Sequence, residues 1–399
     1  PISHYFRQNF SQVTNPPIDS LRENKVMSLK TRFGNLGNIL DFDNLTEENI
    51  YVLESPILTN SQFKKFKSFF KNKIKTLDCT FEINLSLKER IETIKEEAVI
   101  AVREGITNLI LSDKKISSSH ASIPSILAVG AVHSHLVKLG LRGHCSINVE
   151  SSDVLDTHSF MVLIGVGATT INPYLAIDSI YQRFEKNLFS NSDFESCVAK
   201  FKKSIDDGLL KIMSKMGISV ISSYRGGCNF EAVGLSRAIV SDYFPGMSSR
   251  ISGIGIGGIE KKIKKHHKNF ISKNIFTLPI GGIYRYRKTG EQHQFQGNLI
   301  HILQHAVGIG SYEHYKKYSK GIHDLPPISL RDLLQFKSKK NSININEVEP
   351  ISKVLKRFGS GSMSHGALSA EAHETLAVGM NRIKGASCSG EGGEDAKRF

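Results

Sequence analysis

The segment TNLILSDKKISSSHASIPSILAVGAVHSHLVKLGLRGHCSINVE, Thr107–Glu150, decides the predicted fold. Its first seven residues, Thr107–Asp113, form a short apolar run that ends in polar residues, which is typical of a buried strand. Pro124 then begins a helix that ends at Gly140, and His144–Glu150 repeats the strand pattern. A strand, a helix and a second strand in succession predict one parallel β/α unit with a right-handed crossover.

The same alternation continues on both sides of this unit. Upstream, Ser86 and Glu89 form a capping box for a helix whose apolar face runs from Leu87 to Val102. Downstream, the pattern predicts a helix over 153–165, a strand end over 168–174, a long helix over 194–216 and a strand over 218–224. We therefore expect an α/β fold, a (β/α)-barrel-like domain with parallel strands whose carboxyl ends carry the polar residues. Two β/α domains in tandem remain an alternative.

The composition is that of a globular protein with a basic surface. The 399 residues carry a formal net charge of +14, but lysines are dense only in Lys64–Lys75 and Lys261–Lys268. Such runs are typical of solvated helix faces, so we expect no nucleic-acid partner. The longest apolar stretch, Phe160–Ile171, is too short to span a bilayer, so we expect no membrane association.

Five cysteines lie far apart and form no close pair. This spacing argues against a zinc site, a disulfide framework or iron–sulfur ligation within this stretch. Pro1 is not a translation start, and the glycine-rich Ser389–Phe399 resembles an interrupted loop. We therefore expect the sequence to be a fragment of a longer protein.

Two glycine-rich motifs in the middle of the chain have competing interpretations. Gly253–Gly258 (GIGIGG) matches a dinucleotide-binding pattern, but residues 261–290 contain no Asp or Glu, so we expect a flexible connector instead. The second motif is SYRGGCNFEAVG, Ser223–Gly234, in which a strand ends at Tyr224 and Arg225 before a Gly-Gly turn and a short helix with Glu231. Arg225 would either bind an anion or hold the next loop through a carboxylate, and the sequence leaves both roles open.

The last 50 residues carry the strongest local signal. Arg357–Leu376 (RFGSGSMSHGALSAEAHETL) places a Gly/Ser-rich strand end directly before a helix, with Ser364 and Ser369 in position to cap it. Backbone N–H groups at such a junction bind phosphate or the polar edge of a flavin ring. A second loop, SGEGGED, ends the following turn. Without further information, an ordinary β/α loop remains the alternative.

Several long stretches together resemble glutamate synthase, and they occur in the order found in that family's large subunit. The stretches are FSQVTNPPIDSLRE (Phe10–Glu23), LSDKKISSSHASIPSILAVGAVHSHL (Leu111–Leu136), INPYLAIDSI (Ile171–Ile180), GLLKIMSKMGISVISSYRGGCNFEAVGL (Gly208–Leu235), DYFPGMSSRISGIG (Asp242–Gly255) and LQHAVGIGSYEHYKKY (Leu303–Tyr318). MSHGALSAEAHETLAVGMNRI and SGEGGED look like the opening of the family's flavin domain.

The resemblance implies two domains. Residues 1–346, with 1–45 as an N-terminal linker segment, would be the central domain, a barrel-like relative of the flavin domain without cofactor or catalytic residues of its own. Residues 347–399 would begin the FMN-binding synthase barrel, a second TIM-type barrel. By the same resemblance, Met363 and Ser364 would lie near the cofactor, and Ser389, Glu391 and Glu394 on the substrate-side loop. No catalytic residue and no metal ligand is expected within this stretch.

The resemblance also implies the reaction of the whole enzyme. The family makes two L-glutamate from L-glutamine and 2-oxoglutarate, and ammonia passes through a tunnel that the central domain would scaffold. Electrons reach FMN through a [3Fe-4S] cluster, and both cofactors would be bound mostly or wholly outside this stretch. The fragment is not expected to be active alone.

The sequence MSHGALS, residues 363–369, is most similar to the ferredoxin-dependent form of cyanobacteria and red algal plastids. It implies ferredoxin as the partner and the plastid (chloroplast stroma) as the location. The alternatives are an NADPH-dependent large chain, with the bacterial cytoplasm as the location, and a non-catalytic basic β/α binding module.

Two short stretches depart from the family's pattern. The family usually has F-C-T-G-A/G-M-S where this chain has FGSGSMS (Phe358–Ser364). It usually has G-K-S-N-S where this chain has GASCS (Gly385–Ser389). We therefore expect the polar contacts of this loop to differ from those of the family.

Overall fold

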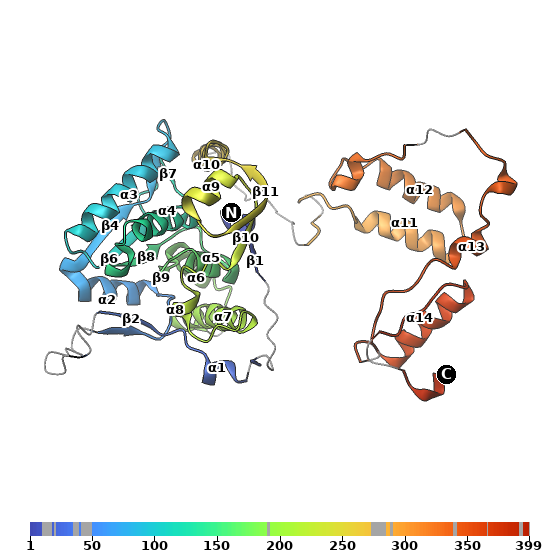
Figure 1. Ribbon diagram of the computed structural model, residues 1–399, viewed down its shortest axis with the longest axis horizontal. Coiled ribbons are helices and arrows are strands. Elements are labelled where there is room, and N and C mark those ends of the chain that lie inside the picture. Colours follow the sequence, from blue (N-terminus) through green and yellow to red (C-terminus); the bar gives the residue numbers. More distant parts are fainter. Residues whose placement is uncertain are drawn as a thin grey trace. The chain divides into compact units, whose positions relative to one another are not determined.

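The structure is a computed structural model that describes residues 1–9, 18–19, 21–34, 40, 50–189, 192–272, 285–287, 290–337, 341–364, 366–390 and 394–398. The chain forms two compact units, Pro1–Leu278 and Pro279–Phe399 (Figure 1). Glu391, one of the predicted substrate-side residues, lies outside the described residues.

A parallel four-stranded sheet lies at the centre of the first unit (Figure 1). Its strands are β4 (Ile74–Asp78), β6 (Asn108–Ser112), β8 (Ser146–Glu150) and β9 (Thr170–Asn172), and they lie side by side in chain order. The connections are α3 (Leu87–Arg103), α4 (Ser125–Lys138) and α5 (Thr157–Gly165). The order does not reverse as it does in a doubly wound sheet. The predicted α/β class with parallel strands is confirmed.

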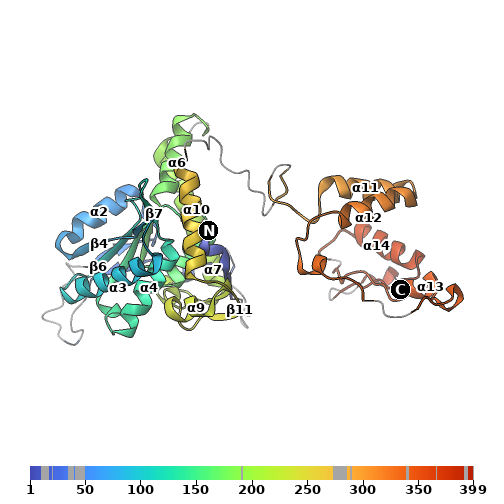
Figure 2. The same ribbon diagram turned by 90° about the horizontal axis from the view of Figure 1, so that it is seen from above.

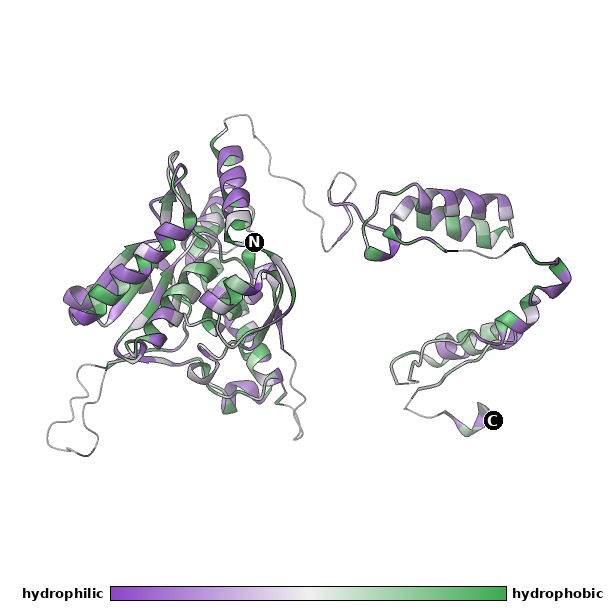
Figure 3. Ribbon diagram, turned by 45° about the horizontal axis from the view of Figure 1, so that its top comes forward, coloured by the Kyte–Doolittle hydropathy of each residue, from purple (hydrophilic) through white to green (hydrophobic). Residues whose placement is uncertain are grey.

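Strand β6 is buried throughout and its three central residues are apolar, because helices cover both faces of the sheet (Figure 2). Leu109 and Leu111 belong to the large core that α3 and α4 share. Ile110 points the other way, into a second cluster with Phe63 and Phe66 of α2 (Asn60–Phe70). Figure 3 shows hydrophobic residues along the strands and hydrophilic residues on the outer helix faces.

Two long helices and a second set of strands complete this unit. The helices are α6 (Tyr174–Glu185) and α7 (Phe194–Lys215). Strand β10 (Phe230–Leu235) pairs in parallel with β11 (Ser248–Ile254) and antiparallel with β1 (Phe6–Gln8), and α9 (Arg237–Tyr243) connects β10 to β11. The remaining elements are α1 (Glu23–Val26), α8 (Ile221–Tyr224), α10 (Ile256–Ile271) and the antiparallel pairs β2 (Thr31–Phe33) with β3 (Tyr51–Leu53) and β5 (Thr80–Glu82) with β7 (His120–Ser122).

The predicted strand over 218–224 is wrong. Only Val220 pairs, with Ser28, and the chain then forms the single helical turn α8. The pairing is short because Ser28 N–H donates to Ser219 and Ile221 N–H donates back to Ser28. The N–H bonds that follow lie within the turn of α8 itself. Glu231 consequently lies on strand β10 rather than on a short helix.

The predicted flexible connector at Gly253–Gly258 is also wrong. Strand β11 runs to Ile254 and α10 begins at Ile256. A Cβ on Gly253 would lie 2.2 Å from the carbonyl oxygen of Gly234, so glycine allows β10 and β11 to approach closely. The motif therefore has a packing role between two strands.

Among the described residues of the second unit, the regular structure is helical apart from one parallel bridge. Helices α11 (Gly297–Gly308) and α12 (Tyr312–His323) pack against each other, and α13 (Ile351–Leu355) and α14 (Ala370–Arg382) follow. Gly359 bridges Ala386 in parallel, with α14 between them in sequence. This is the strand–helix–strand connection of a first β/α unit, as predicted.

Candidate functional site

The loop predicted to lie near the cofactor and the described part of the loop predicted to face the substrate lie side by side in the second unit. Ser360 N–H donates to Ala386 at 3.0 Å, and Ala386 N–H donates to Phe358 at 2.9 Å. These two bonds hold the first loop, which leads into α14, against the second loop, which follows it. The fold therefore places two glycine-rich stretches that are distant in the sequence next to each other.

Met363 and Ser364 meet the second loop at Gly390. Gly390 has a φ of 76°, and a Cβ there would lie 3.2 Å from Ser364 N and 3.3 Å from the Met363 carbonyl carbon. The neighbouring Ser389 is partly buried beside this contact. The structure thus brings Met363, Ser364 and the Ser389–Gly390 pair together.

The first loop is anchored to the helix that it precedes. His373 Nε2 lies 2.9 Å from the Met363 carbonyl oxygen. Ser369 caps α14 by accepting from Ala372 N–H, as predicted. Ser364 does not cap the helix; its carbonyl accepts from Ala367 N–H in a turn before it. Glu394 is partly buried and lies just before the final turn, Ala396–Arg398.

The two stretches that depart from the family pattern contact each other. Cys388 N–H donates to Ser360 Oγ at 3.1 Å, and Cys388 Sγ lies 2.7 Å from Ser362 Oγ. The hydrogen bond from Ser362 and a further one from the Gly390 backbone lower the pKa of the Cys388 thiol. Residues that differ from the family's sequence pattern in one loop therefore contact residues that differ from it in the other loop.

The carboxyl edge of the central sheet is a second place where polar residues gather. Glu150, whose side chain is only 6% exposed, accepts from Ser112 Oγ at 2.6 Å and pairs with Lys114 at 3.0 Å. Asp113 accepts from Ser152 N–H at 3.0 Å and from Ser152 Oγ at 2.6 Å, and burial raises its pKa. The polar groups bond mainly to one another, and Lys114 and Ser152 also line a cavity of about 1230 Å³ beside this edge.

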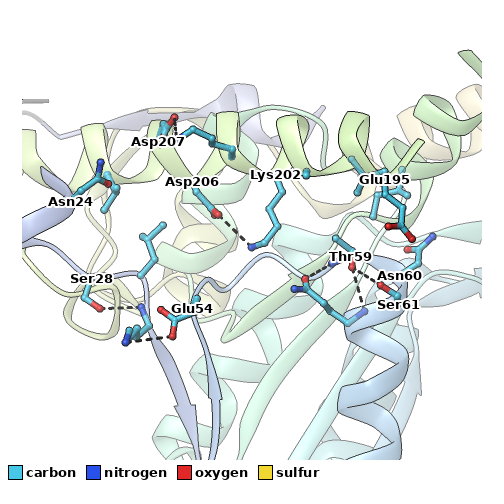
Figure 4. A pocket seen from close by; sticks show the side chains of 18 of the residues that line it. Asn24, Ser28, Glu54, Thr59, Asn60, Ser61, Glu195, Lys202, Asp206 and Asp207 are labelled. Atoms are coloured by element: carbon cyan, nitrogen blue, oxygen red, sulfur yellow. Dashed lines mark hydrogen bonds and ion pairs between the residues drawn. The ribbon is translucent and has the colours of Figure 1, made fainter. Parts of the chain in front are cut away.

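A cavity of about 950 Å³ lies between α7 and the beginning of α2 (Figure 4). At its wall, Lys202 Nζ donates to the Ile57 carbonyl at 2.8 Å and pairs with Asp206 at 3.3 Å. Asp206 also accepts from Ser55 Oγ at 2.6 Å. Burial lowers the pKa of Lys202 and raises that of Asp206. Sequence reasoning missed this pair, because Lys and Asp four residues apart on a helix are an ordinary surface pattern.

The described part of the chain contains neither a group of metal ligands nor a membrane-spanning helix. Among those residues, no three His, Cys, Asp or Glu side chains group as metal ligands. The helices within the same described residues include none long and apolar enough to cross a membrane.

Comparison with known proteins gives consistent matches along the chain. A family model for the glutamate synthase central domain matches residues 1–236, and a model for a conserved region in glutamate synthase matches residues 293–399.

Curated relatives match over essentially the whole chain. Identity is 53% over 401 residues to the NADPH glutamate synthase large chain of Azospirillum brasilense, covering 100% of this chain and 26% of that protein. It is 40% over 401 residues to the NADPH large chain of Bacillus subtilis, covering 100% and 26%. It is 40% over 412 residues to the ferredoxin-dependent enzyme of Pyropia yezoensis, covering 99% and 26%. The chain thus spans about a quarter of the length of these relatives.

Proposed function

The chain belongs to the glutamate synthase family, and from that premise we propose that it is part of a working glutamate synthase large chain. In this proposal, residues 1–346 form the central domain that scaffolds the ammonia tunnel. Residues 347–399 begin the FMN-binding barrel. The whole enzyme forms two L-glutamate from L-glutamine and 2-oxoglutarate. The observation that carries the proposal is the match of both family models, in order, along one chain.

The loops of the second unit fit one wall of a flavin site. Gly390 lies directly against the backbone of Met363 and Ser364, so the surface there is peptide rather than side chain. A flat ring stacks closely on such a surface, and nearby N–H groups suit its polar edge. FMN, when bound, supplies the reducing equivalents. In this proposal Met363 and Ser364 would hold and orient FMN, and Ser389, Glu391 and Glu394 would bind the substrate.

The [3Fe-4S] cluster does not fit this stretch. Cys79 and Cys145 are buried, and burial raises the pKa of both thiols, which disfavours the thiolate that a cluster needs. Among the described residues, the five cysteines form no group of three potential ligands. The proposal therefore assigns the cluster to the rest of the polypeptide.

The electron donor of the enzyme is either ferredoxin or NADPH. The sequence MSHGALS favours ferredoxin and a plastid location. The 53% identity to a bacterial NADPH large chain, against 40% to a ferredoxin-dependent relative, favours NADPH and the bacterial cytoplasm. We give more weight to the identity, because it extends over the whole chain. Glutamate formation by the full-length enzyme, measured with NADPH and with reduced ferredoxin in parallel, distinguishes the two forms.

The flavin-side assignment is tested with Gly390→Ala in the full-length enzyme. An alanine would be strained at φ 76° and would press on Ser364 N at 3.2 Å, so we expect less bound FMN per polypeptide. Gly379→Ala in α14 is the control, since it lies outside both loops and a Cβ there meets nothing within 4 Å. FMN content comes from the flavin absorbance, and ammonia release from glutamine serves as a check on folding. Unchanged FMN content in Gly390→Ala would remove Met363 and Ser364 from the flavin site.

A further inference from the structure

His373 is the single buried residue of helix α14. It is only 3% exposed, whereas the other residues of this helix are partly or fully exposed. An apolar side chain is the ordinary occupant of a buried helix position, because it needs no hydrogen-bond partner. A buried histidine does need one. The partner of this imidazole therefore indicates why a histidine stands here.

That partner is the backbone of the first loop. Nε2 of His373 lies 2.9 Å from the Met363 carbonyl oxygen. A carbonyl oxygen only accepts, so Nε2 carries a proton and donates it. The histidine is itself held in the helix, because its backbone N–H donates to the Ser369 carbonyl at 3.1 Å. The imidazole thus ties the first loop to a fixed point of α14.

This hydrogen bond sets the orientation of one peptide group, the one that joins Met363 to Ser364. A trans peptide group is planar, and its N–H points opposite to its carbonyl. Because the carbonyl is directed at His373, the Ser364 N–H is directed away from the imidazole. Among the described residues, no group accepts a hydrogen bond from this N–H. It is therefore a donor with a set direction that a ligand can use.

The second loop contacts the same peptide group. A Cβ on Gly390 would lie 3.2 Å from Ser364 N and 3.3 Å from the Met363 carbonyl carbon. Both of these atoms belong to the peptide group whose carbonyl His373 holds. Two contacts, one from α14 and one from the second loop, thus restrict its position.

We propose that His373 is a positioning residue of the flavin site, which holds the Met363 carbonyl and so aims the Ser364 N–H at the polar edge of the flavin ring. This inference rests on the proposed function, since it takes FMN to be the ligand of the first loop. A donor that is oriented before the ligand arrives costs less to order on binding. In this arrangement His373 acts through Met363 and does not itself contact the cofactor.

The test compares His373→Gln with His373→Met in the full-length enzyme. Both residues favour helices and are similar in size, but glutamine keeps an N–H donor and methionine has none. Glu374→Met, at the exposed next position, controls for a new methionine on this helix. Each protein is stripped of FMN and titrated with FMN to obtain the dissociation constant from the flavin fluorescence. The reduction potential of the bound flavin is measured on the same proteins.

Loss of the donor should weaken FMN binding. We expect His373→Met to raise the dissociation constant by about tenfold, because the peptide group is no longer held in place. The reduction potential should also become more negative, since an N–H donor at the polar edge favours the reduced ring, which carries more negative charge. His373→Gln should keep both values close to those of wild type, and so should Glu374→Met. Rescue by glutamine separates this role from simple filling of space.

Two results would overturn the inference: wild-type affinity and potential in His373→Met, or equal losses in His373→Gln and His373→Met. Gly390→Ala separates such a failure from a failure of the proposed function. If Gly390→Ala still loses FMN, the flavin assignment stands and only the role of His373 is rejected. If Gly390→Ala keeps FMN as well, both are rejected. Should His373→Met fail to fold, as judged by circular dichroism, His373→Leu takes its place with the same expectations.

Discussion

Lys202 and Asp206 lie four residues apart on α7 and carry opposite charges into a partly buried position (Figure 4). Their side chains are 20% and 21% exposed. The next pair along the same helix, Lys203 and Asp207, has the same spacing, but its side chains are 75% and 55% exposed. Helix α7 thus contains a partly buried ion pair and, at the same spacing, a solvent-exposed pair that serves as its control.

We predict that Lys202→Met or Asp206→Asn each lowers the free energy of unfolding by about 1–3 kcal/mol, because each leaves the partner charge poorly solvated. The double variant is expected to lose less than the sum of the two. Lys203→Met and Asp207→Asn should each change stability by less than about 0.5 kcal/mol. Urea denaturation of all six proteins, wild type included, gives the coupling energy of the Lys202–Asp206 pair and the single losses at both pairs; equal single losses at the two pairs would contradict the prediction.

His133, also a single residue, makes a pH-dependent contribution to the free energy of unfolding. The folded protein binds the proton only near pH 4, whereas the unfolded chain binds it near pH 6.5. Because protonation favours the unfolded chain in this window, stability is intact above pH 6.5 and falls as the pH drops toward 4. The loss is on the order of 3 kcal/mol for the pKa difference involved.

We predict that His133→Asn removes this part of the pH dependence. The Asn oxygen takes the place of Nδ1 as the acceptor for Arg142, but it does not titrate. Urea denaturation between pH 4.5 and 7.5 should give a flatter profile for the variant than for wild type. His144→Asn, at an exposed position, is the control, and a parallel profile for His133→Asn and wild type would rule out this role.

Helix α4 shows how packing between elements overrides helix propensity. Gly130 lies inside α4, where alanine would ordinarily be favoured by about 1 kcal/mol. A Cβ there would lie 2.2 Å from the ring of Phe244 and 2.9 Å from the carbonyl oxygen of Tyr243. Glycine is therefore what allows α4 to contact the end of α9.

We predict that Gly130→Ala destabilises the protein by about 1–3 kcal/mol, since the Tyr243 carbonyl cannot move without shifting α9. Gly143→Ala is the control, because a Cβ at that position meets nothing within 4 Å. The thermal midpoints of the two variants measure the difference. A midpoint for Gly130→Ala at or above that of wild type would show that the two helices separate easily.

The whole molecule consists of two units, and the hydrophobic core of the first is self-contained. The core cluster includes buried side chains from Ile2 to Ile259, all inside Pro1–Leu278. A domain with its own core folds alone as a rule. The division of the synthase into 1–346 and 347–399 describes domains of the full enzyme and stays a prediction.

We predict that residues 1–278, produced alone, unfold in a single cooperative transition. Circular dichroism in the near and far ultraviolet should lose both signals at one temperature, because one continuous core links the sheet and its helices. Loss of the near-ultraviolet signal alone, with strong binding of a hydrophobic dye, would mean that this part needs the rest of the chain for its packing.

The sequence by itself determined those elements whose signals are local. Strands β6 and β8 and helices α3, α4 and α7 have apolar patterns bounded by capping residues and glycines, so each could be predicted from neighbours in the chain. The resemblance implies only that Met363 and Ser364 lie near the cofactor and Ser389 on the substrate-side loop; the contact between the two loops at Gly390 comes from the structure.

The tertiary structure alone decided everything that depends on residues distant in sequence. The segment 218–224 has a strand-like composition, but its hydrogen-bond partner Ser28 offers pairing for only one residue. Lys202 and Asp206 look like any surface pair until Ser55 and Ile57 cover them. Arg225 looks like any polar loop residue in the sequence, and only the folded structure shows that its Nε is buried without a hydrogen-bond partner. Burial and charge balance arise from the folded packing, and a linear pattern does not contain them.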